Sequence, residues 1–139
     1  MNTIDPNEVT VASVGTIISP MLAVEFVKRI CTAQYTGIIT ALRLNGKSEC
    51  IGFTHNLTDL DLAYTMATVH DAVNEKGCES VILVYDKEEG QPLRPTVKEM
   101  EVFDDLHRKL AALSISLIDV ITMSGRRVFS FAEDRVIQN

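Results

Sequence analysis

Hydrophobic and polar positions follow one another along this chain in blocks that predict three amphipathic helices. They cover residues 19–34, 58–76 and 96–113. Each block opens on residues that satisfy free helix amides. These residues are Ser19-Pro20, then Thr58 with Asp61, and then Thr96 with Glu99. The last two pairs have the spacing of a capping box, so the helix starts are predicted more sharply than the helix ends.

Shorter apolar blocks between the helices predict strands. They cover residues 37–44, 50–54, 80–85, 117–123 and 127–131, and a further strand is expected within 9–19. Asn45-Gly46 is the preferred dipeptide of a two-residue hairpin turn, because both positions need positive φ. Residues 80–85 (SVILVY) are apolar without alternation, which favours a central strand covered on both faces. The 127–131 segment is expected at an edge of the sheet.

Helices that alternate with strands imply crossover connections and therefore an α/β fold. We expect one layered domain over residues 1–139, with residues 1–8 flexible. Its sheet is predicted to be mixed and mostly parallel, with five or six strands and about three helices. The charged segment 87–95 reads as a loop within this domain, since neither side alone has enough apolar residues for a separate core.

Composition argues against several classes of function. The net charge of −6 argues against nucleic-acid binding, because an acidic domain repels the phosphate backbone. Neither a secretory signal nor an apolar run long enough for a membrane span is visible, so we expect a cytoplasmic protein without membrane contact. Three widely spaced cysteines, Cys31, Cys50 and Cys78, indicate reduced thiols rather than disulfides or a zinc site.

The second half of the chain carries Tyr85-Asp86 at a strand end, Asp119 within a strand, Gly125-Arg126 in a turn and Phe129-Ser130 after it. In these features it resembles the actinobacterial domain of unknown function 4192 (DUF4192) family. It covers about residues 16–132 and would match only the N-terminal half of family members. It departs from them in lacking their tryptophan pair and their Gly-Phe-x-Pro element. The resemblance implies an α/β fold and an origin in an actinobacterium or one of its phages, and no activity.

Asp86 is the leading candidate for chemistry, because ligands in open α/β sheets bind beyond the carboxyl ends of the strands. A turn aspartate is the simpler interpretation. The candidate ligand-binding residues are Tyr85, Asp86, Arg126 and Ser130. Asp119 is expected to form an ion pair, with Arg126, Arg127 or Lys109 as its partner.

Other motifs point to no catalytic residue, metal or cofactor. His55, Asp59 and Asp61 could supply ligands, but the aspartates are already explained by helix capping. His70 and His107 are expected on exposed helix faces. No glycine-rich phosphate loop and no nucleophile elbow occur.

Two functions remain open from the sequence. The favoured one is a small non-enzymatic interaction module, phage-encoded and acting on a host protein, which binds a partner or a second copy by strand addition at 127–131. The alternative is a small-molecule-binding or hydrolytic domain with its site beyond Tyr85-Asp86. Convergence of the four candidate side chains in one pocket would favour the second.

Overall fold

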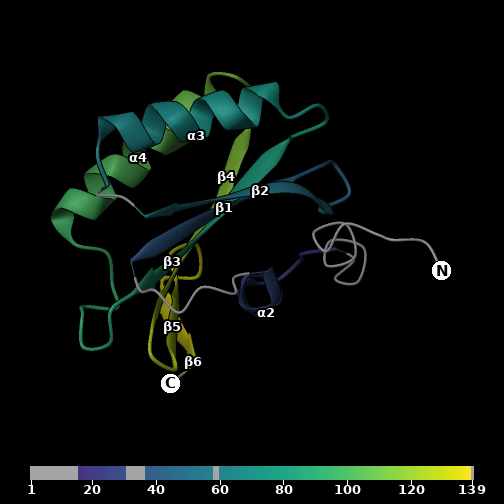
Figure 1. The fold of residues 1–139 in the computed structure, drawn as a ribbon. Coiled ribbons are helices and arrows are strands. Elements are labelled where there is room, and N and C mark those ends of the chain that lie inside the picture. The colour runs from purple at the N-terminus through teal and green to yellow at the C-terminus, as the bar shows by residue number, and fades with distance from the viewer. Residues whose placement is uncertain (1–15, 31–36, 58–59, 139) are drawn as a thin grey trace.

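One mixed sheet of six strands lies between helices in the computed structural model, which describes residues 16–30, 37–57 and 60–138 (Figure 1). The strand order across the sheet is β2-β1-β3-β4-β5-β6. The strands are β1 (Ile38–Leu44), β2 (Cys50–Leu57), β3 (Ser80–Lys87), β4 (Ser116–Ser124), β5 (Arg127–Ser130) and β6 (Arg135–Gln138). The helices are α2 (Pro20–Ile30), α3 (Leu62–Asn74) and α4 (Val97–Ala111). The predicted α/β class, the mixed sheet and the three helices are confirmed.

The expectation that the sheet is mostly parallel is wrong. Among the described strands, only β3 and β4 pair in parallel, and the other pairs are antiparallel. The crossover through α4 joins two neighbouring strands. The crossover through α3 joins β2 to β3, but β1 lies between them and runs antiparallel to both. Helix–strand alternation therefore predicted the crossovers correctly and the pairing incorrectly.

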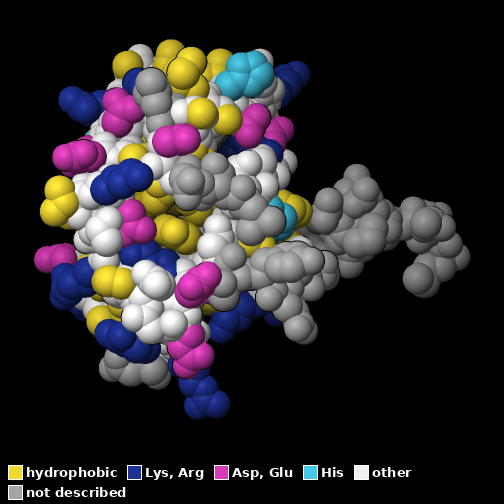
Figure 2. Space-filling view, turned by 60° about the vertical axis from the view of Figure 1, so that its left-hand side comes forward, with side chains coloured by type: hydrophobic (Ala, Val, Ile, Leu, Met, Phe, Trp, Pro, Cys, Tyr) yellow, Lys and Arg dark blue, Asp and Glu magenta, His cyan; other side chains and the backbone are white. Residues whose placement is uncertain are grey.

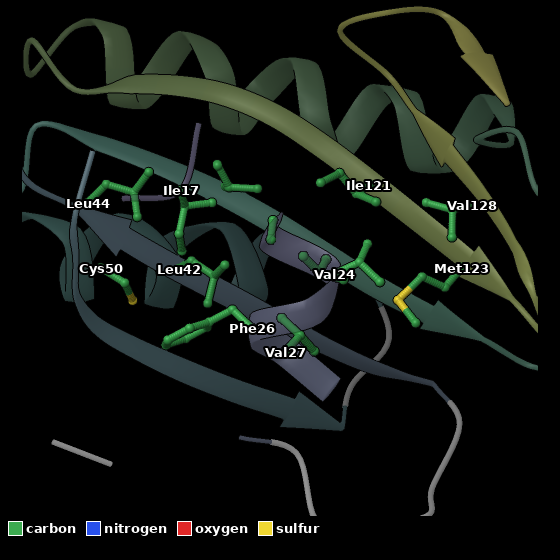
Figure 3. Close-up of a cluster of buried hydrophobic side chains, with 13 residues drawn as sticks. Ile17, Val24, Phe26, Val27, Leu42, Leu44, Cys50, Ile121, Met123 and Val128 are labelled. Carbon is green, nitrogen blue, oxygen red and sulfur yellow. The ribbon is translucent and has the colours of Figure 1, made fainter. Parts of the chain in front are cut away.

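Helix α2 covers one face of the sheet, and α3 and α4 cover the other (Figure 1). On the α2 face, Ser19 caps the helix by accepting a hydrogen bond from the Leu22 amide (3.2 Å), as predicted. Residues 31–36, the end of the predicted helix, lie outside the described residues. The buried core on this face includes Ile17, Val24, Phe26, Val27, Leu42, Leu44, Cys50, Ile121, Met123 and Val128 (Figure 3).

The opposite core lies under α3 and α4. Its largest fully buried side chains are Ile39, Val81, Leu83, Leu106 and Leu110. Helix α3 is capped by Asp61, which accepts from the Tyr64 amide (2.9 Å), and begins after it. The predicted start at Thr58 lies outside the described residues. Strand β3 is the third of six strands and is covered on both faces, which confirms its predicted central position.

The hairpin of β1 and β2 is confirmed, with a longer turn than the predicted two-residue one. Asn45 Oδ1 accepts hydrogen bonds from the amides of Lys47 (2.9 Å) and Glu49 (3.0 Å). The positive φ falls on Ser48 (62°) rather than on Gly46. Asparagine therefore organises this turn through its side chain, which Asn can do without a left-handed backbone.

Strand β6 was not predicted, and it changes the edge of the sheet. It pairs antiparallel with β5, so the prediction that residues 127–131 form an exposed edge available for strand addition is wrong. The four residues of β6 are only partly buried, which leaves little apolar pattern to detect. No helix within the described residues has the length and apolar character needed to span a membrane.

Candidate functional site

A buried lysine lies at the C-terminal end of the parallel pair, where ligands bind in open α/β sheets. Lys87 is the last residue of β3, and its side chain is 4% exposed. Its Nζ donates hydrogen bonds to Glu99 Oε1 (2.7 Å) and to the Pro92 carbonyl (2.8 Å). It also lies over the Tyr85 ring, 5.6 Å from the centroid. A charged ammonium is thus enclosed by two oxygens and an aromatic face.

Helix α4 supplies the carboxylate of this site through its capping box. Thr96 Oγ1 accepts from the Glu99 amide (3.2 Å), and Glu99 Oε1 accepts in return from the Thr96 amide (2.8 Å). The predicted capping box at these two positions is confirmed. The same Oε1 that closes the box also accepts from Lys87, and the Glu99 side chain is only 13% exposed. The cap therefore fixes the position of the anionic partner.

The loop at residues 88–96 folds back over the strand ends and is held there by side chains of β4. Thr122 donates to the Leu93 carbonyl, and Ser124 donates to the Glu88 carbonyl (3.2 Å). Leu93 itself is buried. Together with the bond from Lys87 to Pro92, these contacts close the strand-end region with the chain's own backbone. The buried polar groups named here are all paired, as buried polar groups generally are.

The predicted neighbours Tyr85 and Asp86 face opposite sides of the sheet, because side chains alternate along a strand. Tyr85 packs with the core under α3 and α4, whereas Asp86 lies on the α2 side. Burial raises the pKa of the Asp86 carboxyl, and the nearby Lys28 opposes that rise. The two residues therefore cannot contribute to one site on one face.

Arg126 and Ser130 do not join them. Arg126 lies exposed in the turn between β4 and β5. Ser130 is fully buried, and its hydroxyl donates to Asp119 Oδ2 (2.6 Å). The structure does not bring the four candidate residues together, so their role in binding stays a prediction.

Asp119 forms no ion pair with the predicted basic partners. Besides the Ser130 hydroxyl, it accepts hydrogen bonds at Oδ1 from the amides of Val120 (2.8 Å) and Ala132 (2.8 Å). Burial raises the pKa of this carboxyl, and these three donors oppose the rise. A carboxylate satisfied by three neutral donors ties β4 to the turn after β5. The predicted ion pair is wrong.

Among the described residues, the histidines and cysteines form no reactive group. His55 lies within β2, and its Nδ1 is 2.7 Å from Thr40 Oγ1. His70 contacts Asn74 on α3, and His107 lies on exposed α4 surface. Burial raises the pKa of the Cys50 thiol to about 11, so it stays protonated at neutral pH. Within the described ranges, no three His, Cys, Asp or Glu side chains lie close enough together to hold a metal ion.

Sequence reasoning missed Lys87 because a charged residue beside Glu88, Glu89 and Gly90 reads as loop. A detectable signal was present. Lys87 lies two residues after Tyr85, so both side chains are on the same face of β3. Glu99 is the third helical residue (N3) of a predicted capping box. A lysine on the buried face of a strand requires a partner, and the carboxylate of the box was the available one.

The elements that suggested the DUF4192 resemblance have structural roles here. Asp119 and Ser130 bind one another, and Gly125, with a positive φ of 62°, makes the hairpin turn. Such features follow from a strand–helix–strand–hairpin arrangement, so they specify a fold more than a family.

Comparison with known proteins identifies the family of the chain. No curated protein matches the chain. A family model described as "RadC-like JAB domain" matches residues 17–136. This match overturns the DUF4192 resemblance and the non-enzymatic, phage-encoded interaction module that was predicted beside it. Because the match spans nearly all of the described residues, the chain belongs to the RadC-like JAB domain family.

Proposed function

We propose that this chain is a metal-independent JAB domain. The site at the end of β3, formed by Lys87 and Glu99, holds no metal ion. JAB-type domains are typically metalloprotease-like or DNA-repair-related. The observation that carries the proposal is the buried contact between Lys87 Nζ and Glu99 Oε1 at the end of β3 (2.7 Å). A lysine ammonium has three donors and no acceptor, so it cannot ligate a metal and repels one nearby.

A metalloprotease-like reaction needs a metal, and the residues present do not fit one. Catalytic zinc sites use three protein ligands from His, Asp, Glu or Cys and leave one position open. At the strand end, Glu99 is the carboxylate in contact with Lys87, and its Oε1 is already bonded to the ammonium and to the Thr96 amide. In the part of the chain that the structure describes, no alternative cluster of three such residues exists. We therefore derive no hydrolytic step through a metal.

Net charge and the distribution of surface charges argue against DNA, and we propose a cytoplasmic protein partner instead. The chain carries a net charge of −6, and on the face shown in Figure 2 basic and acidic side chains are interspersed rather than gathered by sign. Binding to a phosphate backbone requires a clustered basic surface. A second copy of the chain is one such partner. Light scattering tests this directly, because it measures the molar mass of the protein in solution. A monomer at high micromolar concentration would exclude self-association.

Metal analysis tests the central proposal. The purified protein is dialysed against Zn²⁺, desalted and measured by mass spectrometry for bound metal, and its melting temperature is recorded with Zn²⁺ and with chelator. We expect substoichiometric metal, no shift of the melting temperature, and no effect of chelator on the rate at which an unstructured peptide is cleaved. A stoichiometric zinc whose removal abolishes peptide cleavage would overturn the proposal.

A further inference from the structure

We propose that the strand-end region is a cation site whose resident cation is the ammonium of Lys87, and that replacing this lysine opens the site to an external cation. The inference rests on the metal-independent function proposed above and deepens it. It assigns the site a ligand class, small ammonium ions and, with suitable ligands, a divalent metal. The Lys87–Glu99 pair is then more than an ion pair that stabilises a loop.

The surroundings of Nζ are those of a bound cation. Its ligands are a carboxylate oxygen of Glu99 (2.7 Å) and the carbonyl oxygen of Pro92 (2.8 Å). The ring of Tyr85 lies 5.6 Å away, within the range of a cation–π contact. A carboxylate and a carbonyl are hard oxygen ligands, which suit ammonium and divalent cations alike. Three separate elements thus supply this cage: the strand, the loop and the helix.

The cage is held in place independently of the lysine. Glu99 is fixed by the capping box with Thr96, and the loop is fixed by Thr122 and Ser124 of β4. Removal of the ammonium therefore leaves the carboxylate in position. A fixed carboxylate without a counter-ion in a buried site binds a replacement cation when one is supplied, because the alternative is an uncompensated charge.

The first test is chemical rescue. In Lys87→Ala, the cage loses its cation and the melting temperature is expected to fall by about 10 °C. Millimolar n-propylammonium should restore several degrees, whereas an equal concentration of NaCl or of the bulkier tetramethylammonium should not. Lys109→Ala is the matched control, since Lys109 pairs with Asp105 on the surface of α4 and should show no amine-specific recovery. Equal recovery with all three salts, or none with n-propylammonium, would contradict the cation site.

The second test converts the site into a metal site. Tyr85 and Lys87 lie two residues apart on one face of β3, and Lys87 Nζ contacts both the Tyr85 ring and Glu99 Oε1. In Tyr85→His/Lys87→His, two imidazoles would face one carboxylate, which is the ligand set of a three-ligand zinc site. We expect one bound metal per chain, measured by calorimetry with Zn²⁺ and by the visible absorption of bound Co²⁺. Tyr85→His alone is the control and should bind none, because Lys87 remains.

The outcomes separate the two proposals. If the wild-type chain binds no metal and the double variant binds none, the cation site is refuted while the metal-independent function stands. If the wild-type chain binds zinc and cleaves peptide, the proposed function is refuted. A variant that is unfolded without metal is tested by circular dichroism with added Zn²⁺. Zinc-dependent folding of the double variant supports the cation site, and its absence in that variant counts against it.

Discussion

Two buried carboxylates in this molecule are stabilised in opposite ways. Glu99, at the end of β3 and β4, is paired with a full positive charge on Lys87. Asp119, farther back along β4, is surrounded by three neutral donors and no basic side chain. Both side chains are largely removed from water, and both tie a loop or turn to the sheet. They differ in whether the compensating charge is a whole ion or a set of dipoles.

The difference teaches where chemistry can be placed in this fold. An arrangement of neutral donors, as at Asp119, holds its carboxylate without a countercharge and leaves nothing to exchange. An arrangement built around a whole ion, as at Glu99, has an occupant that can in principle be replaced. The replaceable ion lies at the strand end where ligands bind in sheets of this class. The neutral arrangement lies in the interior between β4 and the turn after β5.

The largest expected effect comes from breaking the charged arrangement. Lys87→Met removes the ammonium and leaves Glu99 buried without its countercharge. We expect the free energy of unfolding to fall by roughly 3–5 kcal/mol, measured by urea denaturation. Lys109→Met, at a surface pair, is the control and should cost under about 1 kcal/mol. A cost as small as the control's would mean that the buried pair contributes no more than an exposed one.

Breaking the neutral arrangement should cost nearly as much. Asp119→Ala orphans three donors at once, the Ser130 hydroxyl and the amides of Val120 and Ala132. The expected loss is about 3 kcal/mol of unfolding free energy, at about 1 kcal/mol per unpaired donor. Asp104→Ala, on the exposed face of α4, provides the comparison and should be near neutral. Equal stability of the two variants would show that water replaces the lost acceptor.

Removing a single donor should cost less. Ser130→Ala deletes the hydroxyl that donates to Asp119 and accepts from the Glu133 amide (3.2 Å). We expect a loss of about 1 kcal/mol by urea denaturation, because the carboxylate keeps its two backbone donors. A loss as large as that of Asp119→Ala would mean that the hydroxyl, and not the amides, holds the carboxylate.

The smallest effect is a difference in pH dependence. Burial raises the native pKa of Asp119, so the folded state holds its proton at a pH where the unfolded state has released it. Stability from this group is therefore present below about pH 4 and is lost as the pH rises through the raised native pKa. Asp119→Asn should remove that decline, as seen in melting temperatures recorded from acid to neutral pH. A wild-type stability that rises relative to Asp119→Asn over this range would give the shift the opposite sign.

Features determined by neighbours in the sequence were predictable. Ser19 caps α2, and Thr96 with Glu99 caps α4, because a cap joins residues only three apart. The β1–β2 hairpin was predictable for the same reason, although the turn uses the Asn45 side chain and not a two-residue turn. Local chemistry decides such features almost alone.

Features determined by distant partners were not predictable. The position of β1 between β2 and β3 depends on pairings across the whole sheet, and no local pattern reports them. The four candidate binding residues do not lie together, and for Tyr85 and Asp86 the reason is simpler. Neighbours on a strand face opposite sides, so adjacency in the sequence argued against a shared site. The pair that does share a site, Lys87 and Glu99, is 12 residues apart and requires the whole β3–α4 connection to be folded.

That separation along the chain has a consequence for the timing of folding. Three of the strand-end contacts join residues 12, 29 and 36 positions apart, so they need α4 and β4 to be docked before they can form. We predict that they are absent from the folding transition state. Lys87→Met should then accelerate unfolding and leave the refolding rate nearly unchanged in stopped-flow denaturant jumps, and a slowed refolding limb would contradict this. The internal cation would thus determine the lifetime of the folded chain rather than the speed of its assembly.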